Sequence, residues 1–225
     1  MRAKADRLLR RDYYAHAPVE VLLAFGAAIL ALRLAGLVAR RWRVRRAPEL
    51  LAWSAALFSY AVASAALAWG AAHGWDARSF RVYYLFGGLL TAPLLGAGSL
   101  LLWRRHAAGP VVLVYTGLAV GIAIAVPVHG SFGTGIPAAQ DHLEFVPARL
   151  VALVGNSLGT IAVVVVAAAT FRRRPLGNTL IVLGVAIAAI GSALAGLGAS
   201  RTAVFAAAAV VVLYAGFTMR SRTSS

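Results

Sequence analysis

The chain has 225 residues, of which 61% are hydrophobic and 13% are charged, and its mean hydropathy is +0.80. Soluble domains are closer to half apolar and a quarter charged, so this composition excludes a water-soluble globule and an intrinsically disordered chain. The absence of cysteine from the sequence excludes disulfides, thiolate metal sites and cysteine nucleophiles.

Long apolar segments dominate the chain. A helix needs roughly 20 residues to cross about 30 Å of hydrocarbon, and none of these segments shows the period-two alternation of a membrane β-barrel. The sequence therefore predicts an all-α, polytopic membrane bundle of seven transmembrane helices. They span residues 17–38, 50–70, 82–103, 109–128, 148–170, 178–198 and 202–219. Because the last two are separated by only three residues, a bundle of six helices stays open as an alternative.

The expected organisation is a single seven-helix transmembrane domain over residues 17–219. Residues 1–16 form a basic N-terminal tail that could lie at the interface as an amphipathic helix, or could result from the choice of start codon. Residues 220–225 form a short C-terminal tail. We expect no output domain in this chain, because only six residues follow Met219.

The charge is strongly positive, +15 at neutral pH, and the arginines cluster at the ends of the apolar segments. This distribution indicates contact with lipid head groups rather than with nucleic acid. The positive-inside rule favours a multi-pass protein of a bacterial plasma membrane, with its N-terminus outside and its C-terminus in the cytoplasm. On this assignment Glu49 is the one acidic residue on the inner side.

The longest polar connection, residues 129–147, lies on the predicted outer side and contains four groups that could coordinate a divalent cation. These are His129, Asp141, His142 and Glu144. Their spacing matches no metal motif, so the alternative is a solvated loop that turns at its glycines. Zinc-dependent stabilisation that disappears on replacing both histidines would support the metal site.

A second candidate site is a polar pocket at the outer mouth of the bundle. Acidic, histidine and tyrosine side chains concentrate on that side, and a polar group within a membrane often has a functional role. The candidate ligand-binding residues are Glu20, Arg81, Tyr83, Tyr84, Arg149 and Asn156. Arg81 and Arg149 are candidate ion-pair partners for Glu20. For Asn156, the alternative role is a hydrogen bond between packed helices.

Glycines and tryptophans add further expectations. The pairs Gly155/Gly159 and Gly117/Gly121 are spaced for close helix packing, and the five tryptophans, Trp75 among them, fall near predicted interfaces as membrane anchors. The third span contains Gly87, Gly88 and Pro93, which could kink it as in transporters.

Several functional classes lack their motifs. A retinal protein needs a lysine in its last span, and the only lysine is Lys4. No hydrolase elbow, zinc-protease, Walker or dinucleotide-binding motif is present. The sequence therefore predicts neither a catalytic residue nor a cofactor.

The aromatic block Trp69-Gly70-x4-Gly74-Trp75, the segment Phe80 to Gly88 and the following Pro93-Leu94-Leu95-Gly96 resemble a family of uncharacterised seven-span membrane proteins from high-GC bacteria. More distantly, this part of the chain is similar to the seven-helix sensory region of bacterial histidine kinases. The resemblance implies a ligand-responsive or partner-binding membrane protein that signals through a separate membrane or signalling protein. The alternative is a small-solute or lipid transporter that uses the kinked third span, and a bundle that only scaffolds a complex is a third.

Overall fold

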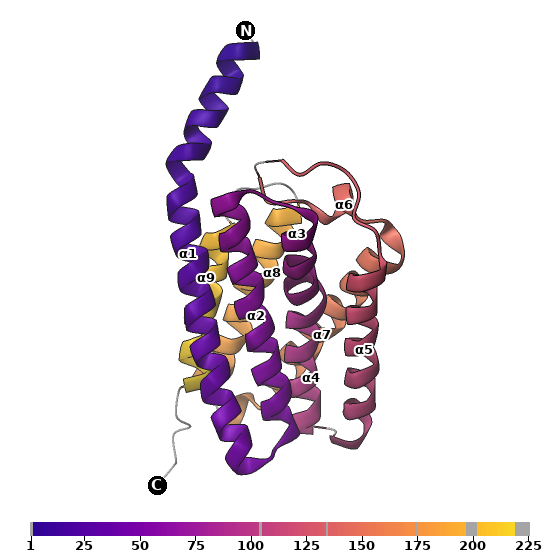
Figure 1. Cartoon of the computed structure of the whole chain (residues 1–225). Coiled ribbons are helices and arrows are strands. Elements are labelled where there is room, and N and C mark those ends of the chain that lie inside the picture. Colours follow the sequence, from indigo (N-terminus) through magenta and orange to yellow (C-terminus); the bar gives the residue numbers. More distant parts are fainter. Residues whose placement is uncertain (1, 104, 134, 174, 197–201, 219–225) are drawn as a thin grey trace.

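The computed structural model describes residues 2–103, 105–133, 135–173, 175–196 and 202–218. Within these ranges it is a bundle of helices without strands (Figure 1). Six helices are long and apolar enough to cross a membrane: Pro18–Arg45, Pro48–His73, Ala77–Trp103, Ala108–Ala125, Phe145–Ala169 and Pro175–Ser192. The chain is an all-α, multi-pass integral membrane protein, as its composition predicts.

The α-helices of the described residues are bounded as follows: α1 Arg2–Arg45, α2 Pro48–His73, α3 Ala77–Tyr83, α4 Thr91–Trp103, α5 Arg105–Ala125, α6 Ala139–His142, α7 Leu150–Ala169, α8 Pro175–Gly196 and α9 Thr202–Thr218. Two π-helical segments, η1 Tyr84–Leu90 and η2 Phe145–Arg149, and the short 3-10 helix η3 Phe171–Arg173 complete the elements.

The last two predicted spans form two separate helices. α8 and α9 pack side by side, and α9 also packs against α1. Among the described residues, six helices meet the length of a span, the number in the six-helix alternative, and α9 is not among them. α9 has 17 residues, so it is an apolar helix slightly shorter than the six that meet the length of a span.

The bundle has α1 and α9 at one side and α5 at the other (Figure 1). α1 packs against α2 and α9, α2 against α4, and α4 against α7, whereas α5 contacts mainly α4 and η1. α1 begins at Arg2, so the predicted N-terminal tail continues the first span as helical backbone. Its side chains, and the tail 220–225, lie outside what the structure describes.

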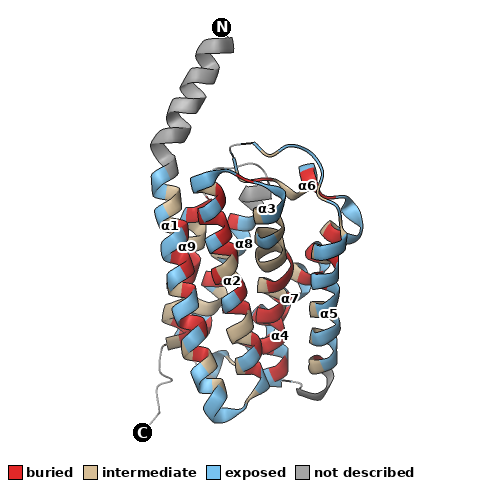
Figure 2. Cartoon of the chain, viewed as in Figure 1, coloured by how far each residue is buried: buried red, intermediate tan, exposed pale blue. Residues whose placement is uncertain are grey.

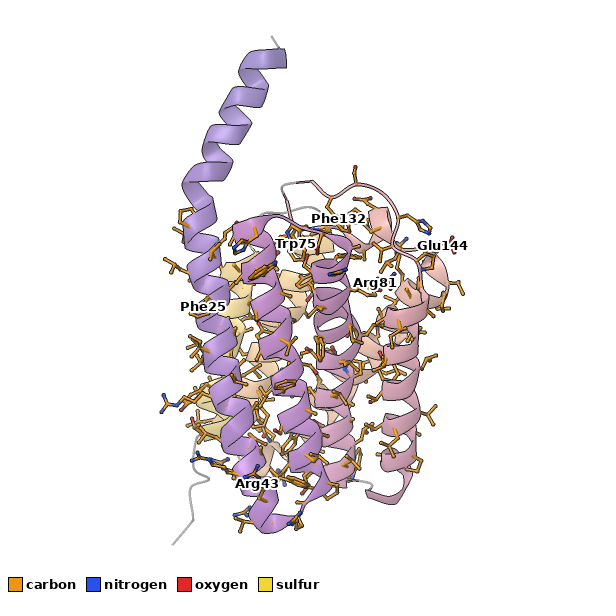
Figure 3. All side chains as sticks on the ribbon, viewed as in Figure 1. Phe25, Arg43, Trp75, Arg81, Phe132 and Glu144 are labelled. Atoms are coloured by element: carbon orange, nitrogen blue, oxygen red, sulfur yellow. The ribbon has the colours of Figure 1, made fainter. Side chains whose placement is uncertain are left out.

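The two ends of the bundle differ in chemistry (Figure 3). Trp75, Arg81 and Phe132 lie at one end, which we call the loop end, and Arg43 lies at the opposite, arginine end. The loop end corresponds to the side predicted to face outward.

Local sequence explains where the elements at the loop end begin and end. The Asp76 side chain accepts a hydrogen bond from the backbone N–H of Ser79, and the backbone N–H of Asp76 donates to the Ser79 hydroxyl. These two bonds form a capping box. This box starts the third span at Ala77, five residues before the predicted start. α5 ends at Ala125, before the predicted end of this span at residue 128. Pro127 explains the difference, because the residue before a proline is disfavoured in a helix.

Close helix contacts occur where glycines remove a side chain. A Cβ atom built on Gly159 would lie 2.9 Å from the Cα of Pro93, and Gly96 faces the backbone of Gly159, so α4 and α7 touch along their backbones. Gly155 lies against the Tyr115 ring, which confirms the predicted packing role of Gly155 and Gly159.

The prediction of a close contact within the chain at Gly117 and Gly121 was wrong for this bundle. Both glycines are exposed on α5, and no described atom lies within 4 Å of the position of a Cβ. They face outward because α5 lies at the edge of the bundle, and only 11% of its spanning segment is buried (Figure 2).

Trp75 is a second departure from expectation. It is buried rather than a membrane anchor, since its ring packs over Gly70 and forms an edge-to-face contact with Tyr83.

Candidate functional site

The third span changes its hydrogen-bonding pattern in the middle. α3 leads into the π-helical segment Tyr84–Leu90, and regular α-helix resumes at Thr91. The N–H of Thr91 bonds to the carbonyl of Phe86, five residues back, and the Thr91 hydroxyl donates to the same oxygen at 2.7 Å. Such π-helical insertions are rare in proteins overall, and those that occur are often found at functional sites. We call this segment the break.

Pro93 explains why carbonyl groups are left over at the break. In a π-helical pattern residue 93 would donate to the carbonyl of Gly88, and in an α-helical pattern to that of Leu89, but proline has no N–H. Such a carbonyl needs another donor, because hydrocarbon offers none.

Side chains of two other helices supply those donors. Asn156 on α7 donates its side-chain amide to the Gly88 carbonyl at 2.8 Å, and the Tyr115 hydroxyl on α5 donates to the Leu89 carbonyl at 2.8 Å. The break is therefore held from two sides by hydrogen bonds that are not part of its own helix. Among the described residues, none donates to the buried Oδ1 atom of Asn156, so this amide is only partly satisfied.

Arg81 connects the third span to the end of α5. Its guanidinium donates to the carbonyl of Ala123 at 2.6 Å and lies 3.4 Å from that of Ile124. Both carbonyls belong to the last turn of α5, which has no further helical N–H to offer them, and a cation is favoured at this end of a helix.

A small hollow lies beside Arg81. Its volume is about 10 Å³, space for roughly one water molecule. Apart from Arg81 and Tyr84, its lining is apolar: Phe80, Ile122, Ala123, Val126, Val128, Leu143 and Ala148. The hollow lies at the loop end, where a polar pocket is predicted, and Arg81 and Tyr84 of the predicted set line it.

Tyr84 belongs to both the hollow and the break. It lines the hollow, its hydroxyl donates to the Ala148 carbonyl at 3.2 Å, and it is the first residue of the π-helical segment. The neighbouring Arg149 lies with its guanidinium 5.5 Å from the centre of the Phe145 ring, an arrangement that favours a cation–π interaction.

The structure brings together only part of the predicted ligand-binding set. Arg81, Tyr84, Arg149 and Asn156 lie on the side of the bundle formed by the third span, α5 and α7. Tyr83 turns away from them toward Trp75, because consecutive helical residues point about 100° apart. Glu20 belongs to α1, which packs against α2 and α9 at the opposite side (Figure 1).

The four predicted metal ligands do not converge. His142 is buried with its ring stacked on Phe132 and beside Phe80, and its Nδ1 atom lies 2.8 Å from the carbonyl of His129. His129, Asp141 and Glu144 are exposed. The part of the chain that the structure describes contains no group of three or more histidine or acidic residues arranged for a metal. The metal site stays a prediction without geometric support here.

Sequence reasoning missed three participants in this region. Tyr115 gave no signal, because a lone tyrosine in an apolar helix resembles any core aromatic residue. Phe80 and Phe132, which enclose His142, were missed because their contacts with the ring depend on how the loop folds over the third span. Pro93 was the one available signal that a carbonyl at 88 or 89 would need a partner.

No family model matches this chain, and comparisons with curated proteins and with solved structures give no match.

Proposed function

We propose that this chain is a ligand-responsive or partner-binding membrane protein in which the break is the element that responds. The observation that carries the proposal is that the carbonyls of Gly88 and Leu89 are bonded by side chains of α7 and α5. Side-chain bonds can be exchanged without unwinding the rest of the helix, so the third span has a point at which a second conformation is accessible.

The loop end supplies the place where the stimulus acts. Arg81 and Tyr84 line the hollow and lie within one helical turn of each other, and Tyr84 starts the break. A molecule that displaces Arg81 from Ala123, or Tyr84 from Ala148, therefore acts directly on the first residue of the break. The resemblance of residues 69–96 to sensory regions of histidine kinases is consistent with this role.

The proposal is tested by filling the hollow chemically. The chain has no cysteine, so Val128→Cys, in the wall of the hollow, creates a unique thiol that a benzyl thiosulfonate reagent can modify. Backbone hydrogen exchange over residues 84–92 is then measured in proteoliposomes. We expect faster exchange in this segment after modification.

The matched control is Ser131→Cys, an exposed position of the same loop, modified with the same reagent. It should leave exchange over residues 84–92 unchanged. Equal exchange before and after modification of Val128→Cys, in protein shown to be fully labelled, would contradict a responsive break.

The alternative, a small-solute or lipid transporter, also draws on the broken third span. The backbone contact of Gly159 with Ala92 and Pro93 closes the space between α4 and α7, so this geometry supports transport less well. Saturable uptake into proteoliposomes that is lost in Gly87→Leu and Pro93→Ala would favour the transporter over the sensor.

A further inference from the structure

We infer that Arg81 and Arg149 bind the phosphate of an anionic phospholipid at the loop end, with one phosphate oxygen in the hollow that Arg81 and Ala148, the neighbour of Arg149, help to line. This inference rests on the proposed function only for the consequence of binding, since a lipid can occupy the hollow whether or not the break responds.

The first argument is the unbalanced charge of the two arginines. Arg81 and Arg149 are both half-buried, and their contacts are the carbonyls of Ala123 and Ile124 for Arg81 and the Phe145 ring for Arg149. Within the described residues, no carboxylate forms an ion pair with either guanidinium. The carbonyl groups satisfy N–H groups of Arg81 but carry no full negative charge, and an anion would neutralise both guanidinium groups.

The second argument is depth in the membrane. Arg81 is the fifth residue of the span Ala77–Trp103, and Arg149 is the fifth residue of the span Phe145–Ala169. At 1.5 Å per residue Arg81 lies about 6 Å from the beginning of its span, and Arg149 directly precedes the regular helix that begins at Leu150. Both arginines therefore lie near the loop-end beginning of a span, where the head groups of one leaflet are expected.

The third argument is the shape and polarity of the surroundings. The hollow has room for a group of about the size of one water molecule, which suits a phosphate oxygen and not a whole solute. Next to it, Ile124, Phe145 and Val146 are each more than half exposed, and they offer an apolar surface on which acyl chains can lie.

These features together select a phosphate-bearing amphiphile. Guanidinium groups bind phosphate oxygens in a bidentate manner, and Arg81 is the charged residue that lines the hollow. The acidic residues of the covering loop, Asp141 and Glu144, are exposed and pair with neither arginine in the described structure, so they leave the guanidinium groups to a ligand.

The test measures protection of one thiol in the hollow. Val128→Cys is reconstituted in nanodiscs of phosphatidylcholine, with or without phosphatidylglycerol, and its rate of reaction with an uncharged, soluble thiol reagent is recorded. We expect phosphatidylglycerol to slow the reaction severalfold. Ser131→Cys is the control for general effects of membrane charge, and its rate should not change.

The role of the arginines is tested in the same background. In the variants Arg81→Gln and Arg149→Gln, the phosphatidylglycerol concentration that gives the same protection of the thiol should rise by about tenfold. Arg78→Gln, an exposed arginine at the same end, should leave it unchanged. If the glutamine variants fail to fold, Arg81→Lys and Arg149→Lys retain the charge without the planar fork and should show partial protection.

Two outcomes would overturn the inference. Either the rate at Val128→Cys is the same with and without phosphatidylglycerol, or inorganic phosphate in phosphatidylcholine nanodiscs protects the thiol equally well, which would identify a site for a free anion. A break that responds to benzyl modification while the lipid gives no protection would leave the proposed function standing without this ligand. Lipid protection of the thiol, together with no change in hydrogen exchange at the break after benzyl modification, would support the lipid site and contradict the proposed function.

Discussion

The side-chain amide of Asn156 donates to the backbone carbonyl of Gly88 at 2.8 Å, and this bond joins α7 to the one segment of the third span that departs from α-helical geometry. In the π-helical pattern the residue five positions later, Pro93, would donate to this carbonyl, but proline has no N–H. The bond therefore replaces a backbone hydrogen bond by one between helices.

Replacing Asn156 by leucine should lower the free energy of unfolding by about 1 kcal/mol, the typical size of a hydrogen bond between membrane helices. It should also speed hydrogen exchange over residues 84–92, because the Gly88 carbonyl loses its donor. Asn178→Leu is the matched control. Asn178 is a buried asparagine that donates to Ala167 and Thr170 at the arginine end, so its loss should destabilise the protein without affecting the break. Equal exchange over residues 84–92 in the two variants would contradict the assigned role of Asn156.

Tyr115→Phe should act on the same segment from the side of α5. The variant removes the donor to Leu89 and keeps the ring that packs on Gly155, so we expect a loss of about 1 kcal/mol and faster exchange at the break. Tyr60→Phe removes a bond of the same length, from Tyr60 to the Ala206 carbonyl between α2 and α9. Thermal unfolding in detergent and hydrogen exchange on both variants provide the comparison, and a break unchanged in Tyr115→Phe would refute the prediction.

Gly159→Ala adds only one methyl group, but it should destabilise the fold strongly. The new methyl group would collide with the backbone of Ala92 and Pro93, and such overpacking costs about 1–3 kcal/mol. Gly117→Ala adds the same methyl group at an exposed helical position with no described neighbour within 4 Å. It should be neutral or slightly stabilising, because alanine favours helix over glycine. Melting temperatures measured in one detergent test both statements, and a similar drop in the two variants would mean that α5 packs against another helix through Gly117.

Acid should loosen the start of the third span. Hydrogen bonds from the side chain and the backbone N–H of Ser79 hold the pKa of the Asp76 carboxyl below its usual value. A lowered pKa in the folded state means that the carboxylate stabilises the fold above the usual aspartate pKa, and that this contribution is lost as the pH falls through the lowered pKa. Hydrogen exchange over residues 77–83, corrected for its intrinsic pH dependence, should therefore increase in acid. Asp76→Ala should show no such pH-dependent change, and a wild-type response identical to that of the variant would exclude the carboxylate as its cause.

Zinc gives a separate test of the loop. Because the His142 ring packs between Phe80 and Phe132, His142→Ala should lower the melting temperature whether or not zinc is present. His129→Ala, at an exposed position, should have little effect. A zinc-dependent rise in melting temperature that both replacements abolish would instead support the metal site that the sequence suggested.

The fold was predictable because length and polarity alone decide where a chain crosses a membrane. Gly87 and Pro93 also marked the location of the break, since their local effects on a helix do not depend on the neighbours. The partners of the break were not predictable in this way. Whether Asn156 reaches Gly88, and whether Tyr115 reaches Leu89, depends on which faces of α5 and α7 meet the third span. Trp75 shows the same limit, because its burial depends on the space that Gly70 leaves for the ring.

The exposed position of α5 has a consequence for how the protein assembles. This helix is apolar enough to enter the bilayer by itself, and its hydrogen bonds to the third span include those of Tyr115 with Leu89 and of Arg81 with Ala123. Since lipid can replace most of its other neighbours at little cost, α5 can join the remaining helices after they have packed, and it can leave them without being expelled from the membrane.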